Sequence, residues 1–337
     1  RLKNVFDTEN ANLLSPIGVV NAREYNGEFE MTIVGVASMD YLQLYKKFTY
    51  SEESSYKLEA IAQKELKRGK VQYQGTLDDF YKTDINGFIK YNVTDVELVV
   101  AIDAKRNLLD IARGICHAGF VPYDDFLFSS KYLDGASLAY CKRNNLVAIR
   151  LKSNGPATTA EGALVKEPKR GIYEYVIDED LTSLYPSLIR TLNISPETLY
   201  GKVLNWNEED YEANVEKTYN IELYSRQSQN IKIQSSDFLK YLTTENLSIA
   251  SNGVLFKMDK IGLIPAILTQ WFNERKRLSK LAEEFALAGD DVQYKYYDQK
   301  QLIQKILLNS FYGVLLLPSF RFYNKQIGES VTLTGQS

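Results

Sequence analysis

The fold of this chain is decided by the stretch KILLNSFYG at residues 305–313. Lys305, Asn309 and Tyr312 recur at helical spacing, so an α-helix would place all three on one face. An ammonium, an amide and an aromatic ring on one surface suit a triphosphate and its base. Gly313 then permits the close approach of a backbone or a ligand. The alternative interpretation is an ordinary amphipathic helix whose polar stripe happens to contain these residues.

A second informative stretch, DLTSLYPS, occupies residues 180–187. The β-branched and aromatic residues at 173–177 predict a strand that ends just before Asp180, where a carboxylate can serve as a metal ligand. Residues 181–185 are expected to turn backbone N–H groups toward an anion, and Pro186 is expected to begin a helix. Magnesium chemistry on a triphosphate requires this combination of a hard oxygen ligand and phosphate-binding donors.

Together the two stretches resemble two motifs of the family B replicative DNA polymerases. Residues 180–187 resemble motif A, and the pattern Lys-x3-Asn-Ser-x-Tyr-Gly at 305–313 resembles motif B. The continuation LIRTLNISPET at 188–198 is similar to the T-even-like bacteriophage branch. This resemblance implies DNA-templated transfer of nucleotides from dNTPs to a primer 3′-hydroxyl. It also implies two Mg²⁺ ions per active site, with Mn²⁺ as an alternative metal.

An earlier stretch, YNVTD at residues 91–95, resembles the third motif of the 3′–5′ proofreading exonuclease. Tyr91 and Asp95 lie one helical turn apart and would face the same way. The resemblance implies that Tyr91 orients a water and that Asp95 holds a metal ion during two-metal hydrolysis of a phosphodiester. Segments 38–48 and 56–62 also resemble the phage exonuclease domain. Taken alone, the motif fits equally a helix with one buried ring and one exposed acid.

The apolar periodicity of residues 267–285 and 292–316 predicts two helices, joined by the turn AGDD at 288–291. Arg275 and Lys305 would then face each other at one level, roughly 21–24 Å from the turn. The resemblance identifies this hairpin as the polymerase fingers, in which basic residues bind the incoming triphosphate.

Within motif A, the resemblance implies that Asp180 binds both magnesium ions with the Leu181 carbonyl as a supporting ligand. Ser183 and Leu184 would offer backbone N–H groups to the phosphates. Tyr185 would pack under the sugar and exclude a 2′-hydroxyl by steric overlap. The alternative for this tyrosine is a core ring that closes the turn.

Within the fingers, Arg275 and Lys305 would neutralise charge on the leaving pyrophosphate. Asn309 and Tyr312 would line the nascent base pair. The predicted sites therefore comprise catalytic residues Asp180, Lys305, Tyr91 and Asp95, metal ligands Asp180, Leu181 and Asp95, and nucleotide-binding residues Ser183, Leu184, Tyr185, Arg275, Lys305, Asn309 and Tyr312.

Composition excludes several other classes of protein. The chain has 337 residues, of which 45% are hydrophobic, so two or more domains are expected. Two cysteines, Cys116 and Cys141, are too few for a disulfide framework or a zinc cage, and His117 is the single histidine. No apolar run approaches the ~20 residues of a membrane span. A net charge of −3 does not argue against DNA binding, because basic residues concentrate locally at Arg275-Lys276-Arg277.

We therefore expect an α/β and α+β multidomain protein with a partial RNase H-like exonuclease domain, a polymerase palm and helical-hairpin fingers. Helical segments are expected around 58–66 and 93–109. Residues 201–250 match no pattern, and the polar stretch 152–161 indicates a linker. The expected divisions are residues 1–107 for the partial exonuclease domain, 108–151 for a segment returning to the amino-terminal domain, 152–262 for the palm with motif A, 263–317 for the fingers with motif B, and 318–337 for the start of a second palm segment.

The family pattern also includes an Asp-Thr-Asp hairpin after motif B and two earlier exonuclease motifs, which these residues do not contain. We expect a fragment of a longer polymerase, inactive by itself, in the cytoplasm of a phage-infected host. Its expected partners are primer–template DNA and dNTPs, with a sliding clamp and other replisome proteins bound through missing regions and no membrane. The alternative is a non-catalytic DNA- or nucleotide-binding subunit of a split or decayed polymerase.

Overall fold

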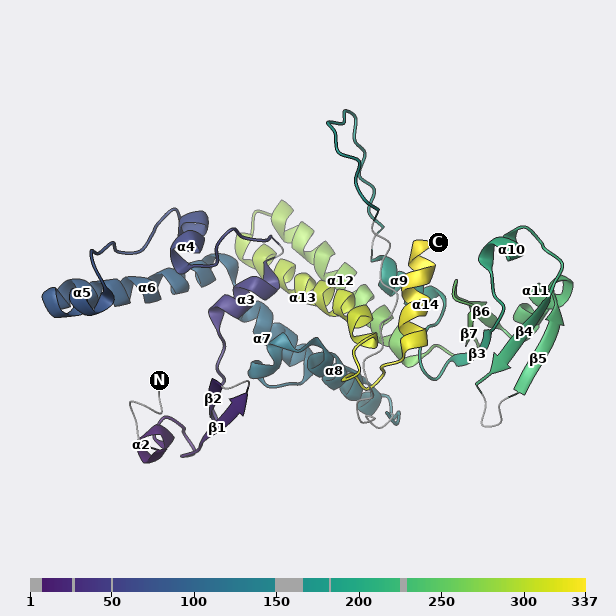
Figure 1. Ribbon diagram of the computed structural model, residues 1–337, viewed down its shortest axis with the longest axis horizontal. Coiled ribbons are helices and arrows are strands. Elements are labelled where there is room, and N and C mark those ends of the chain that lie inside the picture. Colours follow the sequence, from purple (N-terminus) through teal and green to yellow (C-terminus); the bar gives the residue numbers. More distant parts are fainter. Residues whose placement is uncertain (1–7, 26–27, 50, 149–165, 182, 225–228) are drawn as a thin grey trace. The chain divides into compact units, whose positions relative to one another are not determined.

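A computed structural model describes residues 8–25, 28–49, 51–148, 166–181, 183–224 and 229–337. The chain forms two compact units, Arg1–Phe128 and Ser129–Ser337. Both mix helices with antiparallel strands (Figure 1). The predicted linker 152–161 lies outside the described residues. None of the helices in the described ranges combines the length and the apolar composition needed to cross a membrane.

The first unit consists mainly of helices beside one β-hairpin, in which Val20 lies opposite Ile33. Its elements are α2 (Thr8–Asn12), β1 (Val20–Tyr25), β2 (Glu28–Ile33), α3 (Tyr41–Phe48), α4 (Leu58–Leu66), α5 (Leu77–Thr83), α6 (Ile85–Arg106), α7 (Leu108–Gly119) and the 3₁₀ helix η1 (Tyr123–Leu127).

Helix α6 organises the first unit, because α4 and α5 both pack against it. The Asp84 side chain accepts a hydrogen bond from the Gly87 N–H and caps its start. Asn107, with a φ of 53°, ends α6 and begins α7. A helix was predicted over about 93–109, so the observed helix begins a full two turns earlier and breaks at this left-handed residue.

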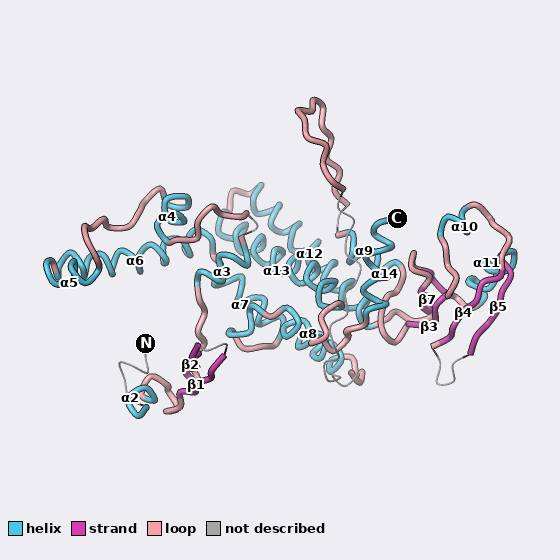
Figure 2. Tube along the Cα trace, in the orientation of Figure 1, coloured by secondary structure: helices cyan, strands magenta, loops and turns pink. Residues whose placement is uncertain are grey.

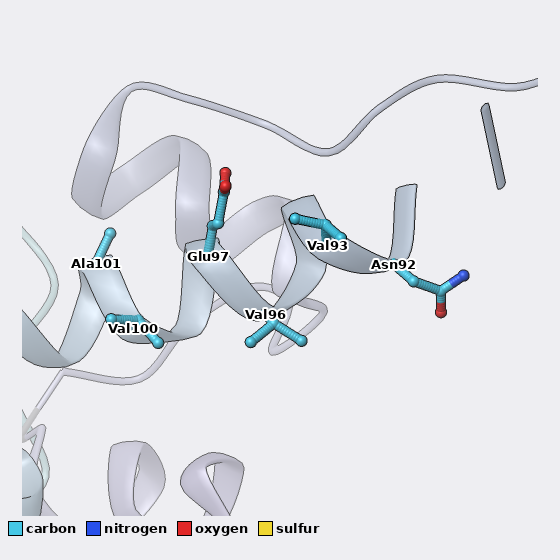
Figure 3. A pocket seen from close by; sticks show the side chains of 6 residues that line it. All are labelled: Asn92, Val93, Val96, Glu97, Val100 and Ala101. Atoms are coloured by element: carbon cyan, nitrogen blue, oxygen red, sulfur yellow. The ribbon is translucent and has the colours of Figure 1, made fainter. Parts of the chain in front are cut away.

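One face of α6 carries an exposed apolar stripe formed by Ile85, Ile89, Val93, Val96 and Val100. Residues of this helix alone line a shallow groove there, and Val96 and Val100 project from the same side (Figure 3). Leu98 and Ile102, by contrast, are fully buried against the rest of the unit. The helix is therefore apolar on two faces, of which only one is covered within this unit.

The second unit begins with α8 (Ser129–Arg143) and continues with α9 (Leu184–Thr191), β3 (Leu199–Val203), α10 (Glu208–Glu212), β4 (Thr218–Leu223), β5 (Gln229–Gln234), α11 (Ser235–Thr244), β6 (Leu247–Ile249), β7 (Val254–Lys257), α12 (Leu263–Leu287), α13 (Asp291–Leu315) and α14 (Lys325–Gln336).

Residues 201–250, which matched no sequence pattern, fold into most of an antiparallel sheet of order β5-β4-β3-β7-β6. Helix α11 covers this sheet, and the rings of Phe238 and Tyr219 pack with centroids 4.4 Å apart. A side chain at Gly201 would place its Cβ 2.4 Å from the Glu222 carbonyl oxygen, and the register shifts at this residue. The sheet was missed because its strands have only three to six residues each, so polar–apolar alternation repeats too few times to stand out.

Helices α12 and α13 form the predicted hairpin, which Figure 2 shows as two long adjacent helices. Gly289 turns the chain with a φ of 74°, and Asp290 caps α13 by accepting from the Gln293 N–H. Along the hairpin, Phe285 stacks on Tyr297 with centroids 5.3 Å apart, and Trp271 contacts Phe311.

The strand predicted at 173–177 is wrong, because residues 166–181 contain neither helix nor strand (Figure 2). Tyr175 has a φ of 58°, which interrupts an extended run. Ile177 is 83% exposed, and no strand of the described chain pairs with this segment. Strand-forming residues give a strand only when a neighbour supplies backbone hydrogen bonds.

Glu65 is the electrostatic centre of the first unit. Its side chain is fully buried and accepts hydrogen bonds from Arg106 and from the Tyr45 hydroxyl, while the Lys105 ammonium lies 3.1 Å away. Burial raises the pKa of Glu65, but the hydrogen bonds from Arg106, Tyr45 and Lys105 outweigh it and lower the pKa to about 2. The carboxylate therefore stays charged and joins α4 to the end of α6.

We predict that Glu65→Gln destabilises the first unit by about 2–4 kcal/mol, because Lys105 and Arg106 lose their anion. Both cations are partly exposed, so the loss of stability is smaller than for a fully buried ion pair. Since the folded pKa is depressed, the contribution is complete above about pH 4.5 and disappears as the pH falls toward 2. Hydrogen exchange of α4 and α6 amides measures it.

The matched control is Glu97→Gln, which removes an exposed ion pair with Arg68 in the same unit. It is expected to cost less than about 1 kcal/mol at any pH. Equal protection losses in the two variants would show that Glu65 contributes no more than a surface charge.

Candidate active site

The start of α9 presents backbone donors at the end of the segment that carries Asp180. Ser183 precedes the helix with a φ of 55°, and its side chain caps no N–H group. The first-turn N–H groups of α9 have no partner within the helix, and the helix dipole adds partial positive charge. The helix begins at Leu184, two residues before the predicted start at Pro186. This end of α9 is chemically suited to an anion.

The α12–α13 hairpin contributes two cations and an amide to the same place. Arg275 extends from α12, and its Nε donates to Gln301 Oε1 of α13 at 3.4 Å. Lys305 and Asn309 lie one turn apart on α13, and both are exposed. The hairpin thus holds the guanidinium by a contact between its two helices and leaves the ammonium mobile.

These groups meet in one cleft of about 400 Å³ within the second unit. One carboxylate shares the cleft with two cations and the start of α9, a set of groups that suits a phosphate chain with its counter-ion. Every predicted polymerase-site residue except Tyr312 lines it. The lining residues are Asp180, Leu181, Ser183, Leu184, Tyr185, Pro186, Arg275, Lys305 and Asn309.

Tyr312 lies directly behind this cleft and packs on Tyr185, with ring centroids 4.4 Å apart and planes at 32°. Burial raises the pKa of Tyr312, and a hydrogen bond with the Thr332 side chain opposes that rise. The Tyr312 side chain therefore remains a neutral phenol. The Tyr185 ring packs on Tyr312 and also borders the cleft. Its role beneath the nucleotide sugar stays a prediction.

Asn193, which the sequence did not single out, fixes α9 to the start of α12. Its side-chain N–H₂ donates to the carbonyls of Lys257 and Lys260, and its Oδ1 accepts from the Gly262 N–H at 2.8 Å. The residue is buried and has a φ of 56°. Asparagine tolerates this backbone conformation and supplies all three bonds. The role of Asn193 in joining α9 to α12 can be recognised only from the residues that lie near it in the folded chain.

A second cluster, in the first unit, joins the predicted pair Tyr91 and Asp95 to Lys70. The Lys70 ammonium lies 2.6 Å from the Tyr91 hydroxyl and 2.7 Å from Asp95 Oδ2. Burial lowers the pKa of Lys70, but hydrogen bonds to Asp95 and Tyr91 outweigh it and raise the pKa. Sequence reasoning missed Lys70 because it lies 21 residues before Tyr91 and outside any motif.

Both clusters contain carboxylate oxygens that could bind a metal ion. Asp95 Oδ1 is buried without a hydrogen-bond partner, and Asp180 offers a carboxylate to an open cleft. Oxygen donors of this kind fit Mg²⁺. No group of three or more His, Cys, Asp or Glu side chains with metal-binding geometry occurs among the residues that the structure describes.

A family model for DNA polymerase family B matches residues 130–337, which is more than half of the chain. The chain belongs to DNA polymerase family B. The matched residues take in the whole cleft, with its motif A and motif B. The polymerase fold is also shared with the family B DNA polymerase of the archaeon Pyrobaculum calidifontis. That structure has a TM-score of 0.64 and 21% identity, over 95% of this chain and 37% of the archaeal one.

Two curated polymerases are similar over the whole of this chain. The DNA-directed DNA polymerase of Escherichia phage RB69 is 28% identical, and that of Enterobacteria phage T4 is 29% identical. DNA polymerase 1 of Pyrococcus abyssi is 32% identical over 52% of the chain. The chain spans 40% of the length of each phage relative. The resemblance to the T-even-like branch is thereby confirmed.

We predict that Asn193→Ala destabilises the second unit of this polymerase chain by about 2–4 kcal/mol, because three buried backbone groups lose their partner and alanine disfavours a positive φ. Urea unfolding followed by the fluorescence of Trp206 and Trp271, the two tryptophans of the chain, measures the loss.

The control is Asn214→Ala, which replaces an exposed asparagine that also has a positive φ, 51°. This variant should lose only the stability that comes from the tolerance of asparagine for a positive φ, about 1 kcal/mol. If the two variants lose equal stability, the hydrogen bonds of Asn193 contribute nothing.

Proposed function

We propose that this chain forms the nucleotide-binding part of a phage-type replicative DNA polymerase, which transfers dNTPs to the 3′-hydroxyl of a primer on template DNA. The observation that carries this proposal is the cleft that Asp180, Arg275 and Lys305 line together. Family membership and the phage relatives support it. The complete enzyme, of which this chain would be 40%, would supply the rest of the DNA path.

Each of these cleft residues would have its own role in nucleotidyl transfer. Ser183 and Leu184 N–H groups and the Lys305 ammonium would bind the phosphates, and Arg275 would neutralise charge on the departing pyrophosphate. Tyr185 would lie under the sugar. No covalent intermediate is required, because phosphoryl transfer depends mainly on positioning and charge.

Asp180 and the Leu181 carbonyl would hold Mg²⁺, with further oxygen ligands from the nucleotide itself. When bound, the ion supplies positive charge to the phosphate oxygens and the primer hydroxyl. The donor set present favours an ion that arrives with its triphosphate, since one carboxylate and one carbonyl leave several coordination positions for substrate and water.

The test is single-nucleotide primer extension by the complete polymerase. We expect Asp180→Asn to lower the rate at least about 100-fold, because the loss of a charge that acts in the transition state costs rate. The matched control, Asp178→Asn, makes the same change two residues earlier, outside the cleft lining. It should stay within about twofold of the unmodified enzyme. Unchanged extension by Asp180→Asn would refute the assignment and favour a purely binding subunit.

A second activity, 3′–5′ proofreading hydrolysis, is favoured by the contact of Lys70 with both Tyr91 and Asp95. We infer that the ammonium orients the phenol and the carboxylate toward a scissile phosphate. Asp95, with its unpartnered buried oxygen, would hold a divalent ion. This activity would require carboxylates from elsewhere in the complete enzyme.

We predict that Lys70→Ala lowers hydrolysis of a mismatched primer end about 10- to 100-fold, as expected for a residue that orients reacting groups. Extension of a matched primer should be unchanged. Arg68→Ala, which removes an exposed cation nearby in sequence, is the control and should leave both rates unaltered. Equal hydrolysis by the Lys70 and Arg68 variants would exclude this role.

A further inference from the structure

Gly335 of α14 lies against the ring of Tyr185, at a position where a side chain would not fit without movement. A Cβ at Gly335 would stand 3.1 Å from Tyr185 Cε1, 3.6 Å from Cδ1, and 3.4 Å from Leu188 Cδ1. The first distance is shorter than carbon atoms in van der Waals contact allow. The missing side chain is therefore what permits the observed position of the ring.

The Tyr185 ring has a second aromatic contact. Tyr312 packs on it at 4.4 Å, and the side chain of Thr332, again from α14, hydrogen-bonds to Tyr312. Helix α14 thus contacts one ring directly and restrains the other. Tyr185 itself lines the cleft together with Arg275 and Lys305.

We propose that Gly335 is a positioning residue for nucleotide selection: the absence of a side chain there sets how far the Tyr185 ring extends into the space for the nucleotide sugar. The inference rests on the proposed function, in which Tyr185 lies under that sugar. A Cβ at position 335 requires its neighbours to give way by a few tenths of an ångström. In this proposal the Tyr185 ring gives way toward the cleft that it lines. The sugar of a bound dNTP then loses room, and that of a ribonucleotide loses more.

The first test is Gly335→Ala in the complete polymerase, assayed by single-nucleotide insertion. We expect KM for the dNTP to rise about tenfold, since misplacement by a fraction of an ångström is costly at a reacting centre. KM for the ribonucleotide rises by at least the same factor. The value of kcat stays within about twofold, because the groups that act on the phosphates do not move.

The control is Gly328→Ala on the same helix. Its new Cβ would stand 2.1 Å from Leu316 Cδ2 and would touch neither tyrosine. This variant perturbs the packing of α14 more severely, so it reports what general loosening of the helix does. It should lower the melting temperature and leave KM within about twofold. A tenfold rise in KM for both variants would overturn the proposal.

A double-mutant cycle with Tyr185→Ala separates the ring contact from other effects. Once the ring is absent, Gly335→Ala should change KM by less than about twofold. A full effect of Gly335→Ala in that background would also overturn the proposal.

A readout independent of catalysis completes the test. With 3-fluorotyrosine at position 185, Gly335→Ala should shift the ¹⁹F resonance of that ring, and Gly328→Ala should not. If the unmodified complete enzyme fails to extend primers, the proposed function is wrong while the ring contact is still measured. If extension is normal and the resonance does not move, the positioning role is wrong and the proposed function stands.

Discussion

The packing of α9 between the α12–α13 hairpin and α14 is the constraint on which the second unit depends. A helix of eight residues is not stable alone, so its place is set by neighbours. Ile189 is fully buried on its inner side, Asn193 holds its end, and Tyr185 at its start packs on Tyr312. The cleft is therefore a product of tertiary packing, and its geometry will follow any change in these contacts.

The two clusters of this polymerase chain use their cations in opposite ways. In the cleft, Lys305 is exposed beside Arg275, and their charge faces open space that an anionic ligand can enter. In the first unit, Lys70 is already engaged by Tyr91 and Asp95. An incoming phosphate would meet available positive charge at the first site and a neutralised pair at the second, so binding at the second demands a rearrangement or an added metal charge.

Sequence patterns predicted the parts of the fold that depend on local periodicity. The helix at 58–66, the hairpin with its turn at Gly289, and the meeting of Asp180 with Arg275 and Lys305 follow from spacing and from motif order. The sheet of β3 to β7 was not predicted, since strands of three to six residues repeat the polar–apolar alternation too few times. At residues 173–177 a strand was predicted where none forms, because a strand needs a pairing partner that residue propensity does not reveal. The roles of Asn193, Lys70 and Gly335 depend on contacts between distant segments, which no local pattern encodes. The functional roles of the cleft residues and the finer domain divisions stay predictions.

The apolar stripe along α6 affects how strongly copies of this polypeptide associate with one another in solution. Five half-exposed isoleucine and valine side chains on a single helix form an apolar ridge that favours self-association. The small net charge of −3 at neutral pH provides little electrostatic repulsion between molecules. Self-association through this ridge would grow with protein concentration and with kosmotropic salt, and weaken on cooling. Dilute, low-salt, cold solutions are thus the conditions under which the separated chain stays dispersed.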